Sequence, residues 1–149
     1  MIIRMEHPYK WLVKYFVLGA IPATVYVCIE VLYRGYSDIS MWVLSFFLCL
    51  LVGEINEYIP WDTPLTLQMF LGAIIVTVGE LVAGLILNVW LGLNIWDYSN
   101  VPLNFMGQIC APFSVIWYFL SAVAIVVDDY LRYWLFDEEK PRYRLFEGL

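Results

Sequence analysis

The stretch "IIVTVGELVAGLILNVW", residues 74–90, decides the fold class of this 149-residue chain. It is apolar enough to cross a bilayer, yet it carries Glu80 near its middle and Asn88 two helical turns later. A charged side chain at the centre of a bilayer costs at least ~2.5–3.5 kcal/mol, so it persists where something uses it or pairs with it. The stretch therefore predicts a membrane-spanning helix with a polar group that has a role.

The composition of the whole chain is that of an integral membrane protein. Hydrophobic residues make up 62% and charged residues 15%, whereas soluble domains have about 45–50% and about 25%. We predict a single membrane domain over residues 1–149, because no stretch is polar enough to form a separate soluble module. The acids lie inside or beside apolar runs, so we expect no nucleic-acid partner. Cys28, Cys49 and Cys110 lack metal-ligand spacing, and we expect neither a metal site nor a cofactor.

Four segments have the length that a spanning helix needs, which is ~20 mostly apolar residues. They are residues 11–33, 41–59, 65–91 and 111–136, separated by turn-forming stretches such as "RGYSDIS" and "PWDTP". We therefore predict an all-α integral membrane fold with four transmembrane helices. Seven of the eight Lys and Arg residues fall on one side of this arrangement. The positive-inside rule makes that side cytoplasmic, so both termini are predicted inside the cell.

Each predicted span carries a face of small and polar residues, because residues three, four or seven apart share a helix face. In the third span this face holds Ala73, Thr77, Glu80, Gly84 and Asn88, and the opposite face holds Ile75, Val78, Val82, Leu85, Ile86 and Val89. The corresponding faces hold Gly19, Ala23, Tyr26, Glu30 and Arg34 in the first span, Gly53, Glu54 and Glu57 in the second, and Ser114, Trp117, Ser121, Ala124, Asp128 and Arg132 in the fourth. Small residues let helices approach closely and polar residues hydrogen-bond across them, so these faces are predicted to meet inside the bundle.

The intramembrane polar residues predict a pathway for a solute or a cation. Its candidate residues, ordered along the chain, are Glu30, Arg34, Glu54, Glu80, Asn88 and Asp128. With ~1.5 Å of rise per residue, Glu30 falls near the outer end, Glu80 near the middle, and Glu54 and Asp128 toward the cytoplasm. Inward-facing carboxylates at successive depths can pass a proton or coordinate a cation.

A structural interpretation of the same residues stays open. Glu30 and Arg34, like Asp128 and Arg132, are four positions apart and could form ion pairs at helix ends. Glu80 has no basic residue within helical reach, so its structural interpretation is a protonated carboxyl group. Its hydrogen-bond partner would then be Thr77, Asn88 or a neighbouring helix.

The segment between the third and fourth spans, "NIWDYSNVPLNFMGQICAPF", is too polar to face lipid and too aromatic to be a free loop. We predict an interfacial or re-entrant cap over the outer mouth of the bundle, since irregular backbone at that depth must be covered by protein or line a cavity. Its candidate binding residues are Trp96, Asp97, Asn100, Asn104 and Gln108. The alternative is a loop anchored by Trp96 and Phe105, without a binding role.

Three runs of the sequence resemble a known family: "EVLYRGYSDISMW", "GELVAGLILNVWLGLNIWDYSN" and "VPLNFMGQICAPFSVIW". They are similar to the small bacterial CmpB-like membrane proteins of the ABC-transporter type IV family, over about residues 15–120. The resemblance rests on the order of Glu80, Gly84, Asn88, Trp96 to Ser99, Asn104 and Gln108. It implies a multi-pass protein of the bacterial cytoplasmic membrane with a permease-like role, and it carries over no catalytic residues. The chain has no phosphate-binding loop, so any ATPase would be another polypeptide.

Two functions compete on these observations. The first is a transporter or channel component that moves a small solute or cation and uses its carboxylates for binding or proton coupling. The second is a structural or partner-binding subunit, of a holin-like or assembly type, whose polar faces serve packing. We do not expect an enzyme, because the only histidine is His7 and no nucleophile elbow or metalloprotease motif occurs. The expected partners are the lipid bilayer and either further copies of the chain or a separate subunit.

Overall fold

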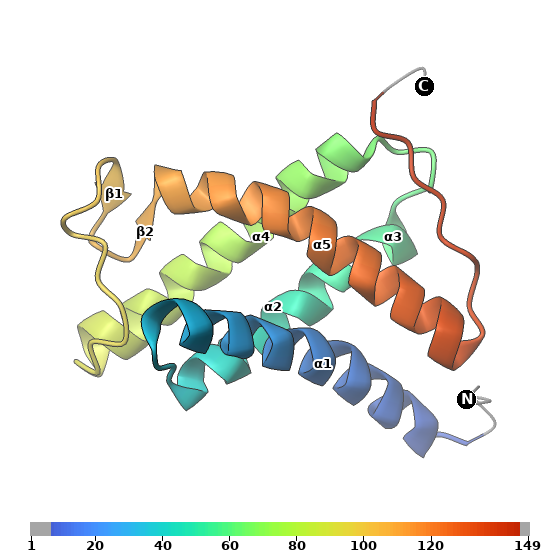
Figure 1. The fold of residues 1–149 in the computed structure, drawn as a ribbon, viewed down its shortest axis with the longest axis horizontal. Helices are drawn as coiled ribbons and strands as arrows, with labels where there is room; N and C mark the ends of the chain where they lie inside the picture. The colour runs from blue at the N-terminus through green and yellow to red at the C-terminus, as the bar shows by residue number, and fades with distance from the viewer. Residues whose placement is uncertain (1–6, 147–149) are drawn as a thin grey trace.

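The computed structural model describes residues 7–146, and long helices account for most of them (Figure 1). The helices are α1 (Tyr9–Arg34), α2 (Ile39–Gly53), α3 (Ile55–Tyr58), α4 (Leu65–Gly84) and α5 (Ala111–Phe136), and a π-helix, η1 (Leu85–Trp90), continues α4. Four stretches in this region are long and apolar enough to cross a membrane: Tyr9–Arg34, Ile39–Tyr58, Leu65–Trp90 and Ala111–Phe136. The prediction of four spanning helices is confirmed, and the predicted bounds differ from these by at most two residues.

Local chemistry explains where several helices begin and end. The side chain of Asp38 accepts a hydrogen bond of 2.8 Å from the backbone N–H of Ser40, which caps the first turn of α2. Gly35 follows α1 with a left-handed φ of 83°, and its N–H donates to the carbonyl of Val31. Such a residue after a helix is usually glycine, because a side chain is strained in that conformation.

The four long helices pack as two pairs, α1 with α2 and α4 with α5, and α2 joins the pairs. Helix α2 contacts both α4 and α5. Figure 1 shows α4 and α5 crossing, so that their ends diverge. At the crossing a Cβ on Gly72 would lie 2.5 Å from the Ser121 hydroxyl, so the helices are as close as a glycine allows. Gly72 was not placed on the predicted face, but members of the two predicted faces do meet where Thr77 and Ser114 form a hydrogen bond of 2.9 Å.

The burial of α4 follows the predicted faces with one exception. Ala73, Glu80 and Gly84 are buried. The residues of the opposite face that are exposed in the isolated chain, as expected of lipid-facing positions, are Val78, Val82, Ile86 and Val89. Ile75 was predicted to share that face, and this was wrong, because it packs against the core cluster formed by Val52, Ile55, Leu65, Met69 and Ile125.

Both described ends of the chain lie at the same end of the bundle, which we call the terminal end. Lys14, near the start of α1, forms an ion pair with Glu138, which follows α5. Residues 137–146, which we call the strap, run from the end of α5 back to the start of α4 (Figure 1). There the carbonyl of Arg144 accepts a hydrogen bond of 2.6 Å from the backbone N–H of Leu65.

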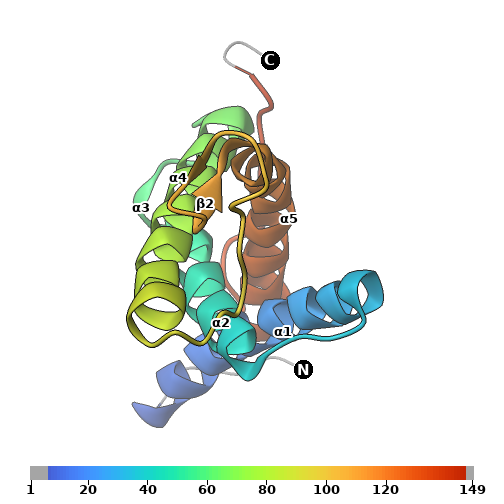
Figure 2. The ribbon, with the colours of Figure 1, turned by 90° about the vertical axis from the view of Figure 1, so that its left-hand side faces the viewer.

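Residues 91–110, which we call the lid, lie at the opposite end. The lid carries a short antiparallel hairpin, β1 (Asn104–Phe105) and β2 (Ile109–Cys110). Figure 2 looks at this end and shows the lid lying across the ends of α4 and α5. Gly84 meets the lid, not another helix, because a Cβ there would lie 2.6 Å from the side-chain oxygen of Gln108.

Candidate functional site

Glu80 lies inside the bundle near the lid and is only 4% exposed. One carboxylate oxygen accepts a hydrogen bond of 2.7 Å from the Tyr98 hydroxyl, and the other accepts one of 3.1 Å from the indole N–H of Trp117. No Lys or Arg within residues 7–146 forms an ion pair with it. Thr77 and Asn88 were candidate partners and bond elsewhere: Thr77 bonds to Ser114, and Asn88 bonds to the lid. Of the three candidate partners, the neighbouring helix is the one observed.

Tyr98 connects the lid to Glu80. Its ring stacks on Phe113 of α5 with centroids 4.8 Å apart, and its hydroxyl reaches Glu80. Burial and the nearby carboxylate of Glu80 raise the pKa of Tyr98, so the hydroxyl keeps its proton at physiological pH. A hydroxyl can donate to a carboxylate or accept from a carboxylic acid. The contact can therefore exist with Glu80 charged or neutral, but with its direction reversed.

Asn88 and Gln108 form the second connection between α4 and the lid. The amide of Asn88 donates to the side-chain oxygen of Gln108 at 2.9 Å, and its own oxygen accepts from the N–H of Ile95 at 2.6 Å. Asn88 lies in η1, and π-helical turns occur often at functional sites because they reorient side chains out of the α-helical register. Trp96 is buried, and its indole donates to the carbonyl of Gln108.

The remaining cap candidates shape the lid itself. Asp97 is exposed and accepts hydrogen bonds from the hydroxyl and the backbone N–H of Ser99, which lower the pKa of its carboxyl group. Asn104 donates to the carbonyls of Ser99 and Val101 and accepts from the N–H of Gly107. Asn100 is exposed in a turn. These three residues stay at the lid surface, so the predicted cap set divides into an inner part and an outer part.

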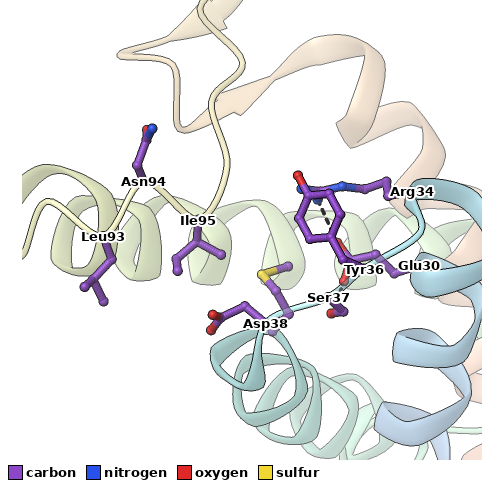
Figure 3. Close-up of a pocket in the computed structure, with 9 residues that line it drawn as sticks. Glu30, Arg34, Tyr36, Ser37, Asp38, Leu93, Asn94 and Ile95 are labelled. Atoms are coloured by element: carbon purple, nitrogen blue, oxygen red, sulfur yellow. Dashed lines mark hydrogen bonds and ion pairs between the residues drawn. The ribbon is translucent and has the colours of Figure 1, made fainter.

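Glu30 and Arg34 lie beside a pocket of about 210 Å³ between the α1–α2 turn and the lid (Figure 3). They form the expected ion pair at 2.8 Å, and Ser37 donates to the other oxygen of Glu30 at 2.6 Å. Asp38 and Asn94 complete the polar wall from opposite sides. The pocket opens at the lid end, and the Glu30 and Arg34 side chains in its wall neutralise each other.

Arg132 is the centre of an ionic cluster at the terminal end, where it is 2% exposed. It contacts Asp128 at 2.6 Å and Glu54 at 2.8 Å, with Glu57 at 3.5 Å and Glu138 at 3.8 Å. These acids come from α5, from the junction of α2 and α3, and from the strap. The cluster therefore ties the elements of the terminal end together.

Polar groups lie between the two ends of the bundle. Tyr26 lies near Glu30 and Glu80, and Cys49 lies near Tyr26 and Asp128. The oxygen Oδ1 of Asp128 is buried without a hydrogen-bond donor. Of the predicted series of carboxylates, Glu30, Glu54 and Asp128 are ion-paired within the described chain, and Glu80 is not.

Several residues of these sites were not among the pathway or cap candidates, although Trp117 and Arg132 were predicted on the polar face of the fourth span. Tyr98 and Trp117 hold Glu80, and Arg132 organises the terminal end. Asp129 is 3% exposed and accepts hydrogen bonds from Asn56 and Tyr143. The adjacent acids at positions 128 and 129 inside an apolar span were the available signal for this second site. Within residues 7–146, no group of three or more His, Cys, Asp or Glu side chains is placed to hold a metal ion.

Comparison with known proteins gives one result. No curated protein and no solved structure matches the chain. A family model matches residues 7–143, which extends the resemblance seen in the sequence to the start of α1, the rest of α5 and the strap up to Tyr143. Because this match covers nearly the whole chain, the protein belongs to the family described as "Putative ABC-transporter type IV".

Proposed function

We propose that the protein is a small integral membrane transporter or channel component, not an enzyme, that moves a proton, a cation or a small solute. Glu80 is its central ionisable group. The observation that carries the proposal is the environment of Glu80, which is buried, lacks an ion-pair partner in the described chain and is bonded by a residue of the lid. Ionisation of a buried carboxyl group without a counter-ion has a high free-energy cost. Binding of a proton or a cation removes this cost and changes the hydrogen bonds of the group.

The contacts at the two ends support a cycle in which each end opens in turn. At the lid end, the Tyr98–Glu80 and Gln108–Asn88 bonds hold the lid in place. At the terminal end, the Arg132 cluster and the Lys14–Glu138 pair close the bundle. Protonation of Glu80 replaces a charge-assisted hydrogen bond from Tyr98 with a weaker neutral one, so the charge of the site and the position of the lid are coupled.

A structural or partner-binding subunit is the second candidate function. The ion pairs Glu30–Arg34 and Asp128–Arg132 favour this function, because a carboxylate that is already neutralised by an arginine stabilises the packing and need not take part in transport. In that case transport would belong to a separate subunit of a complex, or to an assembly of several copies. Flux through the purified protein alone distinguishes the two functions.

The orientation in the bacterial cytoplasmic membrane is part of the proposal. The basic residues gather at the terminal end, so we expect that end, with both termini, in the cytoplasm and the lid outside. In a variant without native cysteines, a membrane-impermeant maleimide added to intact cells should label a cysteine at Asn100 and spare one at Asp62. Labelling at position 62 with protection at position 100 would reverse the orientation.

The Glu80→Gln variant tests the function. Gln retains an oxygen that accepts from Trp117 and an NH₂ that donates to the Tyr98 hydroxyl, so the fold should be preserved. It cannot ionise, so pH-dependent or cation-dependent flux into proteoliposomes should fall by about tenfold or more. Melting temperature and flux are measured on the same preparation.

Tyr98→Phe is the matched control for this test. It leaves the carboxyl group in place and removes only the bond to the lid, so flux should persist with a changed pH dependence. A well-folded Glu80→Gln protein with wild-type flux at every pH would refute the transport role of Glu80. Absence of flux in the wild type would favour the structural subunit.

A further inference from the structure

A second pocket, of about 330 Å³, opens at the terminal end, away from Glu80 and the lid. It lies where α3, α5 and the strap come together. Its walls are formed by Asn56, Glu57, Trp61, Asp129, Arg132, Glu138 and Glu139. The pocket was not predicted from the sequence, because its walls come from two stretches, residues 56–61 and 129–139, that are far apart in the chain.

The charge of the pocket favours a cationic ligand. Four acids line it, and Arg132, the basic residue in its wall, contacts Asp128 and Glu54, while its Nη1 has Glu57 and Glu138 nearby at 3.5 and 3.8 Å without a hydrogen bond. Lys14 pairs with Glu138, and Arg142 pairs with Glu139. The four lining acids, their three basic partners and the two further acids that pair with Arg132 together comprise six carboxylates and three basic groups, within the described residues. The net negative charge attracts a cation and repels an anion.

Asp129 is the acid in the wall that lacks an ion pair within the described chain. Its oxygen Oδ2 accepts hydrogen bonds from the Asn56 amide at 2.7 Å and from the Tyr143 hydroxyl at 2.8 Å. Burial and the neighbouring Asp129 carboxylate raise the pKa of Tyr143, so this hydroxyl stays protonated and remains a donor. Both donors approach one oxygen, and they orient the carboxylate without neutralising its charge.

Asn56 adds an acceptor that the protein leaves without a donor. The residue is 8% exposed, and its amide group is committed to Asp129. Its side-chain oxygen is buried and has no hydrogen-bond partner. Buried acceptors are nearly always satisfied, so this orphan beside the pocket indicates a donor from outside the protein, either a water or a group of a ligand.

Size and wall chemistry distinguish between kinds of cation. The described acids are not grouped as metal ligands, and a bare ion would leave most of the space empty. Trp61 places an indole in the wall, and aromatic rings attract organic cations by a cation–π interaction. An ammonium group also supplies the N–H donors that the Asn56 oxygen and the carboxylates require.

We propose that this pocket binds a small organic cation with primary ammonium groups, such as a short aliphatic diamine. One ammonium lies between Asp129, the Asn56 oxygen and Glu57, and the remainder of the ligand lies against Trp61 and the acids of the strap. The idea that this ligand is transported rests on the function proposed above. Binding of the ligand to the pocket does not.

The test measures thermal stabilisation of the purified full-length protein by 1,4-diaminobutane at constant ionic strength. A ligand that binds only the folded state raises the melting temperature in proportion to its occupancy. We expect the diamine to raise the melting temperature more than sodium does, and more than tetramethylammonium, which has no N–H donors. Equal stabilisation by all three would show charge screening only and would overturn the proposal.

Variants locate the ligand. Glu57→Gln removes a partly exposed acid whose only ionic contact among residues 7–146 is with Arg132, at 3.5 Å, so the variant should fold normally. Its apparent dissociation constant for the diamine should rise at least ~tenfold, as expected when one partner of a charged hydrogen bond is lost. Asp129→Asn should do the same. Glu57→Gln carries the test if the Asp129 variant does not fold.

Two controls separate this site from surface charge and from transport. Asp62→Asn removes an exposed acid at the same end outside the pocket and should leave diamine binding unchanged. Glu80→Gln should also bind the diamine normally, even though it is expected to lose flux. Unchanged binding in Glu57→Gln would refute the site, and this result would say nothing against Glu80. Wild-type flux in Glu80→Gln with intact diamine binding would refute only the transport role of Glu80.

Discussion

Replacing Arg132 by Met is expected to cause the largest loss of stability of any single charge removal in this protein. Arg132 is almost fully buried and faces Asp128, Glu54, Glu57 and Glu138. Met preserves much of the side-chain volume but leaves these carboxylates to repel one another. Removal of one partner of a buried ion pair costs about 3–5 kcal/mol, and we expect a loss in this range. The measurement is the thermal unfolding of the detergent-purified variant.

Arg142→Met is the matched control for that variant. Arg142 pairs with Glu139 at 2.9 Å, but both side chains are mostly exposed to solvent. Exposed ion pairs contribute about 0–1 kcal/mol, so the melting temperature should hardly change. If the Arg132 variant were as stable as the Arg142 variant, the ionic cluster would not hold the terminal end together.

Gly53→Ala is the second variant with a large expected effect on stability. A Cβ at this position would overlap the carboxylate of Asp128, which is buried and bonded to Arg132. The methyl group must therefore displace Asp128 or push α2 away from α5. Overpacking of this kind costs about 1–3 kcal/mol, which exceeds the gain of at most about 1 kcal/mol from replacing a helical glycine by alanine. Thermal unfolding measures the difference.

Gly79→Ala makes the same chemical change where the neighbour can move. A Cβ on Gly79 would meet the terminal methyl of Leu48, which can rotate aside, whereas Asp128 is held in place. The gain in helix propensity then compensates the contact, and stability should stay near that of the wild type. Equal destabilisation of the two variants would mean that tight packing in general, and not the position of Asp128, is responsible.

The helices were predictable from the sequence because the bilayer imposes a length and a composition on each span. The third span illustrates this: periodicity placed Glu80 and Gly84 on the buried face and Val78 and Val82 on the exposed face. The pairs Glu30–Arg34 and Asp128–Arg132 were also predictable, because residues four apart meet on any helix. These features depend only on local geometry.

The contacts that define the two ends were not predictable in this way. Glu80 is bonded by Tyr98 of the lid and by Trp117 of α5, and these contacts depend on how far each segment is shifted along its neighbour. The pocket beside Asp129 depends on the path of the strap, which returns to α4 after leaving α5. A single sequence contains no measure of such registers, and loops without regular structure show no periodicity from which to infer them.

The strap also has a consequence for the order in which the protein is made. Helix α4 begins after Pro64 without a side-chain cap, and the N–H of Leu65 bonds to Arg144 while the Thr66 hydroxyl bonds to the carbonyl of Leu145. The Thr66 contact joins positions 79 residues apart. The first turn of α4 is therefore synthesised long before its partners leave the ribosome. Until then its free N–H groups bond to water, and we expect the terminal end to close as a late step of assembly.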